Sequence, residues 1–174
     1  MNVTEYTAQA SSLLMPIAND RAYLIPMIVG ETGELFGQRA KAVWHQWTPE
    51  RLQLELVSEY GDIAWGTAIL MQLEGSNLTR FAADHPMTGT RDPLTGVRNP
   101  WQTLLNRAND LHYWYTERET HGYIRGTAEA MWVALEVHCQ AITGVSFEEV
   151  LNKNLAKLHS RAERGTLIGS GDHR

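Results

Sequence analysis

A stripe of apolar residues between Thr48 and Leu70 constrains the fold of this chain more than any other feature. Its members recur at spacings of three or four residues, the period of an α-helix that buries one side: Leu52, Leu56, Tyr60, Ile63, Thr67 and Leu70. Thr48, Pro49 and Glu50 predict where this helix begins, because threonine favours the N-cap, proline the first helical position and glutamate the first turn. The sequence therefore predicts a long helix that packs against other helices.

Helical patterns cover most of the remaining chain, and no segment shows the residue alternation of a strand. We expect two helical stretches over residues 11–42, broken or bent near Pro26, with Asn19 or Asp20 as a further plausible cap of a new helix. Further helices are expected over 101–120 and over 126–141, with Gly144 beyond the end of the latter. A last helix begins after Ser146, its predicted N-cap. The Gly- and Pro-rich residues 75–100 predict a long irregular connection. The fold class is therefore an all-α antiparallel bundle.

Length and composition narrow the class of protein. At 174 residues the chain is long enough for one domain with a substantial core, and we assign residues 1–174 to a single domain. The net charge of −5 argues against broad binding to nucleic acid or to an anionic membrane. There is no apolar run of the ~20 residues that a membrane span needs and no signal-peptide pattern. The single Cys139 lies in an apolar helical stretch, which fits a buried thiol in the cytoplasm.

Two pairs of acidic residues are the strongest functional signal. Glu31 and Glu34 form the first pair and Glu59 and Asp62 the second, each spaced i, i+3, so each pair shares one helix face. The pairs lie on consecutive predicted helices with a short connection, which makes them neighbours in space. Four carboxylates around one point call for cations, and hard oxygen ligands suit Mg²⁺ or Mn²⁺. Because protein-bound Mg²⁺ is often completed by substrate phosphates, the pattern predicts an enzyme that acts on a phosphorylated small molecule.

Two details distinguish these pairs from ordinary solvated helix faces. Gly33 and Gly61 each lie inside a pair, and glycine within a helix costs roughly 1 kcal/mol relative to alanine. Such a cost suggests a close backbone approach or room for a ligand. In addition, neither pair has a Lys or Arg four residues on to form the ion pairs of a solvated face.

The acidic pairs and their flanking residues carry a resemblance to a known family. Residues 30–35, a spacer of 24 residues between Glu34 and Glu59, and residues 55–65 resemble the two motifs of the MazG-like all-α nucleoside triphosphate pyrophosphohydrolases. This match covers mainly residues 20–72. Asn154, Lys157 and Arg161, together with the residues that follow Arg164, resemble the end of phage members of the MazZ type. Residues 73–145 carry no usable resemblance.

The resemblance implies a reaction and its cofactors. Glu31, Glu34, Glu59 and Asp62 would be the catalytic acids and would hold Mg²⁺ or Mn²⁺, as two or more ions. The reaction would be hydrolysis of a nucleoside triphosphate between the α- and β-phosphates, giving the monophosphate and pyrophosphate. Similarity to the MazZ-type phage members favours purine deoxynucleotides, dGTP first and then dATP. The family further implies a homo-oligomer, a dimer or a tetramer, in the cytoplasm of a phage host.

Phosphate and base contacts need further side chains. Lys41 lies seven residues beyond Glu34, on the same helix face, and resembles the lysine that follows the family's first motif. Asn154, Lys157 and Arg161 share one face of the last helix and offer donors for phosphate oxygens. Candidates for a nucleobase slot are Asn19, Trp44 and Trp47, although such aromatic residues occur more often in cores and interfaces.

Other readings of the same residues remain open. The substrate could instead be a pyrimidine deoxynucleotide (dUTP or dCTP) or a modified nucleotide removed by a house-cleaning enzyme. A different class of protein, a non-catalytic regulatory module, would keep the acids for a structural cation. A di-iron carboxylate bundle is disfavoured, because the chain has no Glu-x-x-His pair.

Overall fold

The computed structural model describes residues 1–84, 99–118 and 121–166. All regular secondary structure within these residues is helical, which confirms the all-α fold class. The α-helices are α1 (Val3–Ser11), α2 (Arg21–Trp44), α3 (Pro49–Leu73), α4 (Leu78–Asp84), α5 (Pro100–Tyr113), α6 (His121–Thr143) and α7 (Phe147–Glu163). A 3₁₀ turn, Pro16–Ala18, precedes α2, and a π-helical segment, Trp114–Arg118, follows α5.

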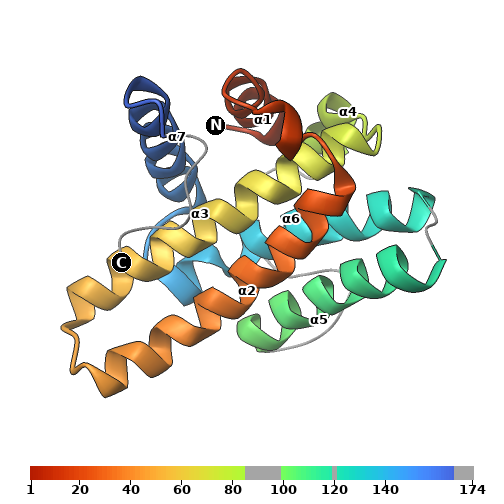
Figure 1. Cartoon of the computed structure of the whole chain (residues 1–174). Helices are drawn as coiled ribbons and strands as arrows, with labels where there is room; N and C mark the ends of the chain where they lie inside the picture. Colours follow the sequence, from red (N-terminus) through yellow and green to blue (C-terminus); the bar gives the residue numbers. More distant parts are fainter. Residues whose placement is uncertain (85–98, 119–120, 167–174) are drawn as a thin grey trace.

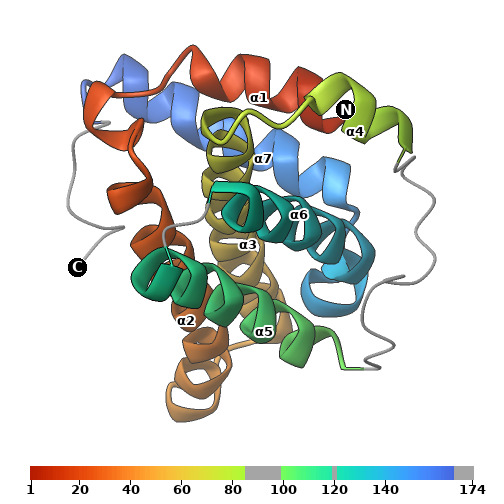
Figure 2. The same cartoon turned by 90° about the vertical axis from the view of Figure 1, so that its right-hand side faces the viewer.

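Helix α3 is the centre of the molecule. Helices α2, α3, α6 and α5 form a bundle in which α2 packs on α3, α3 on α6, α6 on α5, and α5 on α2 (Figure 1). Helices α1 and α7 lie side by side across the remaining side of α3 (Figure 2). The far end of the α2–α3 pair, near residues 45–48, extends beyond the other helices (Figure 1). Helix α3 is therefore enclosed along most of its length.

The residues of α3 explain this central position. Thr48 caps the helix by accepting a hydrogen bond from the Arg51 backbone N–H, and Pro49 occupies the first turn, as the sequence predicts. The predicted stripe is buried from Leu56 onward, and Leu52 is partly buried. Burial also extends well outside the stripe, because α3 packs against α2, α6, and the pair of α1 and α7. The additional buried apolar residues are Val57, Ala64, Ala68, Ile69 and Met71. The Tyr60 hydroxyl donates to the Leu135 carbonyl at 2.7 Å and ties α3 to α6.

The N-terminal half confirms the predicted cap at Asp20, whereas the predicted break near Pro26 is wrong. Helix α2 continues through Pro26, and the interruption lies at residues 12–20, where Asp20 caps α2 by accepting from the Ala22 N–H at 2.8 Å. Pro26 is exposed and near the start of a helix whose packing against α3 and α5 holds it in place despite the missing N–H. The expected irregular connection is also partly wrong, because residues 78–84 form α4; residues 85–98 lie outside the described residues.

The C-terminal half follows the predicted order with shifted boundaries. Helix α6 begins at His121, five residues before the predicted start, because packing of the buried Ile124 outweighs the low helix propensity of two nearby glycines. Gly144 ends the region with a φ of +77°, as expected for a glycine at a helix C-terminus. Ser146 caps α7 by accepting from the Glu149 N–H at 3.2 Å, as predicted, while the Glu149 carboxylate pairs with Lys153.

Burial raises the pKa of the Cys139 thiol to about 11, so this side chain is an inert core residue, as its apolar surroundings predict. Among the described residues, none of the helices is both long and apolar enough to cross a membrane.

Candidate metal centre

Three carboxylates from α2 and α3 meet at one point. Oxygen atoms of Glu31, Glu34 and Glu59 all lie within 4.8 Å of one another, close enough to hold a single cation. Their exposure is graded, because Glu59 is buried, Glu31 is partly buried and Glu34 is exposed. The acidic cluster, as we call these three residues, therefore has a buried wall on α3 and an open side on α2. The antiparallel packing of α2 on α3 brings together carboxylates from two helices.

The acidic cluster retains a proton near neutral pH. Burial, followed by the charge of Asp62 and a hydrogen bond to Glu59, raises the pKa of Glu31 from 4.5 to about 8. Burial also raises the pKa of Glu59, although hydrogen bonds from Gln38 and Glu31 oppose this rise by stabilising its charged form. Glu31 therefore shares its proton with Glu59. A cation bound at this point would displace that proton and neutralise the same negative charge.

A buried amide, Gln38, completes the inner wall. Gln38 lies on the face of α2 that carries Glu31 and Glu34, seven and four residues further along. Its side-chain Nε2 donates to Glu59 Oε1, and its side chain is 3% exposed. Its Oε1 is buried without a hydrogen-bond partner in the described part of the chain. This orphaned oxygen and the three clustered carboxylates form a donor set of hard oxygens, which fits Mg²⁺ or Mn²⁺.

Asp62, the fourth predicted ligand, lies beside the acidic cluster but is held by α7. Asp62 Oδ1 accepts from Asn154 Nδ2 at 2.9 Å, and Oδ2 accepts from Lys157 Nζ at 2.6 Å. Its charge nevertheless acts on the cluster, since it contributes to the raised pKa of both Glu31 and Glu59. The structure thus brings three of the four predicted acids to one point and places the fourth between that point and α7.

The contact between α3 and α7 depends on a close backbone approach at Gly61. A Cβ atom at this position would lie 2.9 Å from Asn154 Cβ and 3.0 Å from Asn154 Nδ2. Asn154 is 3% exposed and accepts from the Tyr6 hydroxyl at 2.7 Å, so a buried hydrogen-bond chain runs from Tyr6 through Asn154 to Asp62. The other glycine within an acidic pair, Gly33, has open space around it.

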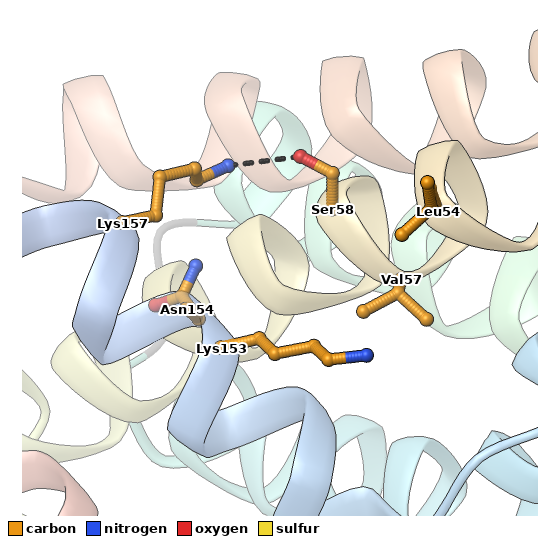
Figure 3. Close-up of a pocket in the computed structure, with 6 residues that line it drawn as sticks. All are labelled: Leu54, Val57, Ser58, Lys153, Asn154 and Lys157. Carbon is orange, nitrogen blue, oxygen red and sulfur yellow. Dashed lines mark hydrogen bonds between the residues drawn. The ribbon is translucent and has the colours of Figure 1, made fainter. Parts of the chain in front are cut away.

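The predicted phosphate-binding residues occupy two places. Asn154 and Lys157 line a shallow groove between α3 and α7, where Lys157 Nζ also donates to Ser58 Oγ at 3.1 Å (Figure 3). The groove continues along Leu54, Val57 and Lys153. Arg161 is partly exposed one turn beyond Lys157, and Lys41 is exposed in the last turn of α2. The α7 residues therefore lie beside Asp62, and Lys41 lies towards the far end of the α2–α3 pair.

The predicted nucleobase residues do not form one slot. Asn19 precedes α2 and Trp44 is its last residue, so the length of the helix, about 36 Å at 1.5 Å per residue, separates them. Trp44 is 83% exposed. Trp47 stacks on His45, and the Arg51 guanidinium lies 4.4 Å from the centre of its ring. Trp47 is thus engaged with its own neighbours in the α2–α3 connection.

The sequence prediction missed three side chains around the acids: Gln38 donates to Glu59, Tyr6 donates to Asn154, and Ser58 accepts from Lys157. Gln38 had a usable signal, because its spacing from both Glu31 and Glu34 puts it on their face. Tyr6 had none, because its partner Asn154 is 148 residues away. No protein-family model, curated protein or solved structure matches this chain.

Proposed function

We propose that this protein is a metal-dependent nucleoside triphosphate pyrophosphohydrolase that cleaves between the α- and β-phosphates. One observation carries the proposal: three carboxylates crowd within 4.8 Å on the open side of a helix pair, and one of them stays protonated near neutral pH. Such crowding is unfavourable unless a proton or a cation relieves it, and a bound cation would replace the proton. The resemblance of residues 30–35 and 55–65 to the MazG-like motifs supports the same reaction.

The residues of the acidic cluster would have different roles, because they differ in exposure to solvent. Buried Glu59, held by Gln38, gives the centre a fixed side, whereas exposed Glu34 faces solvent, from which the substrate arrives. One of the carboxylates would take the proton of the attacking water as general base. Mg²⁺ or Mn²⁺ at this point, as two or more ions, would neutralise the triphosphate and lower the pKa of a bound water for attack at the α-phosphorus.

Helix α7 would supply cations for the phosphates. Lys157 now pairs with Asp62 at 2.6 Å, and its side chain is partly exposed at the groove. A phosphate oxygen beside Asp62 offers Lys157 a second anionic partner, and Arg161, one turn away, suits bidentate contact. Lys41 would act from α2. We rank purine deoxynucleotides first as substrates, on the resemblance to MazZ-type phage members, ahead of pyrimidine or modified nucleotides.

One observation favours a second function. Both carboxylate oxygens of Asp62 already accept hydrogen bonds from α7, an arrangement that ties helices together. In a non-catalytic regulatory module, the acidic cluster would hold a structural cation for the same purpose. This alternative predicts stabilisation by the metal without turnover.

We further propose that the protein forms a homo-oligomer, a dimer or a tetramer. The far end of the α2–α3 pair carries apolar side chains that the described residues leave uncovered: Val43 is 82% exposed, Trp44 is 83% exposed and Leu54 is also exposed. Exposed apolar groups that gather on one projecting element are typical of interfaces.

The first experiment measures pyrophosphate release from each common dNTP and NTP with Mg²⁺ or Mn²⁺. It compares the wild type with Glu34→Gln and with the control Glu129→Gln, on α6, which carries no candidate residue. Turnover of one substrate class that is lost only in Glu34→Gln supports the proposal. Release of phosphate or tripolyphosphate moves the cleaved bond and contradicts it. No turnover, with a melting temperature that still rises with metal, favours the regulatory module.

A further inference from the structure

Gln38 has an unexplained oxygen at the edge of the acidic cluster. Its Oε1 is buried, and no hydrogen-bond donor in the described residues reaches it. Leaving a buried polar atom without a hydrogen-bond partner destabilises the folded state. Native proteins rarely retain such an atom without a reason, and an ion or a water at the site is a common one. The lack of a hydrogen-bond donor for Gln38 Oε1 among the described residues therefore points to a ligand at this position.

The amide is fixed in an orientation that keeps this oxygen near the carboxylates. Nε2 donates to Glu59 Oε1, and the opposite orientation would set the amide oxygen against a carboxylate oxygen, which is repulsive. Nε2 and Oε1 are bonded to the same carbon, so Oε1 lies beside the acidic cluster wherever Nε2 reaches Glu59. Gln38 also shares its helix face with Glu31 and Glu34.

We infer that Gln38 belongs to the metal centre: its Nε2 holds Glu59 in position, and its Oε1 is a neutral oxygen ligand of the bound cation. This inference rests on the metal centre of the proposed function. A carbonyl oxygen is a hard donor that suits Mg²⁺ and Mn²⁺. A neutral ligand also completes coordination without adding charge to a cluster in which burial and nearby acids already raise the pKa of Glu31 and Glu59.

A metal-binding experiment that needs no substrate tests this inference. The probe is Mn²⁺ alone, titrated by electron paramagnetic resonance and by calorimetry at pH 8. Four proteins are compared. The wild type stands beside Gln38→Met, which keeps the length of the side chain but has neither the amide oxygen nor the N–H donor, and Gln38→Glu, which keeps an oxygen ligand but removes the donor. The control is Gln140→Met, on the exposed side of α6. Circular dichroism establishes that each variant is folded, and Gln38→Leu replaces Gln38→Met if the latter is not.

The expected result is specific to an oxygen ligand. Gln38→Met weakens Mn²⁺ binding by about 10-fold or more, within the range seen when groups around a metal are removed. Gln38→Glu binds Mn²⁺ at least as tightly as the wild type, and Gln140→Met is unchanged. An ionised carboxylate cannot donate to Glu59, so recovery in Gln38→Glu would come from its oxygen ligand, with its negative charge adding to the attraction for Mn²⁺.

Two results would overturn the inference. Unchanged binding in Gln38→Met makes Gln38 an ordinary core residue. Loss of binding in both Gln38→Met and Gln38→Glu reduces Gln38 to a donor for Glu59 and removes it as a ligand. A wild-type protein that binds Mn²⁺ but hydrolyses no nucleotide contradicts the proposed function and leaves this test valid.

Discussion

Replacing each glycine within an acidic pair by alanine should stabilise the protein at Gly33 and should not stabilise it at Gly61. Both Gly33 and Gly61 lie inside helices, so alanine gains about 1 kcal/mol of helix propensity at either position. At Gly33 nothing lies within 4 Å of the new Cβ, and the gain is kept. At Gly61 the new Cβ would lie 2.9 Å from Asn154 Cβ. Overpacking of this kind costs about 1–3 kcal/mol.

Asn154 cannot retreat easily from the new methyl group, because hydrogen bonds to Tyr6 and Asp62 hold it from both sides. Since the propensity gain is common to both variants, the difference between them is the overpacking cost, about 1–3 kcal/mol. At about 2–4 °C per kcal/mol for a chain of this size, Gly61→Ala should melt roughly 2–12 °C below Gly33→Ala.

Urea denaturation and thermal melting of both variants, measured without metal, test this reasoning. The same titration gives the slope of free energy against urea, which must be equal in the two variants for the comparison to hold. Equal stabilisation by both alanines would show that α7 does not approach α3 at Gly61 as described, and the account of how Asp62 is held would fail with it.

Three further predictions follow from the same contacts. The pKa of Glu31 is raised from 4.5 to about 8, so between these two pH values the folded protein binds more protons than the unfolded chain. The free energy of unfolding without metal should therefore fall as pH rises through this window. The affinity for Mn²⁺ should rise over the same window, because the metal competes with the proton. Melting and calorimetry across pH 5–9 check both, and a metal-free melting temperature that rises between pH 5 and pH 8 contradicts the sign. Tyr6→Phe removes the donor to buried Asn154 and should cost about 1–3 kcal/mol in urea denaturation, whereas Tyr23→Phe, at an exposed position, should cost little. Trp44→Ser should lower the oligomeric state in light scattering without lowering the melting temperature of the monomer, because the side chain is 83% exposed; an unchanged molar mass argues against this surface as an interface.

The local features of this fold could be predicted from the sequence. The caps at Thr48 and Ser146 and the stripe on α3 depend on residues within a few positions of one another, and the structure confirms each of them. The helix spacing likewise predicted that Glu31 and Glu34 share a face. Such features follow from helical geometry, which a short stretch of sequence already contains.

The features that the sequence did not predict depend on tertiary contacts. The extension of α6 back to His121 and the continuation of α2 through Pro26 are cases in which packing outweighs local propensity. That Asp62 is turned towards Asn154 and Lys157 could not be read from its own helix, because these partners are 92 and 95 residues away. The separation of Asn19 from Trp44 could not be predicted either, because it depends on α2 being one continuous helix rather than two.

The hydrogen-bond chain from Tyr6 through Asn154 to Asp62 has a consequence for synthesis on the ribosome. The α2–α3 pair, with its short connection, can form as soon as about 70 residues have emerged, whereas Asp62 obtains its partners only after α7 has been made. A nascent chain would thus carry the three clustered carboxylates well before Asp62 is fixed. The three carboxylates and Gln38 all lie on α2 and α3, so this part of the site is synthesised first and Asp62 is fixed last.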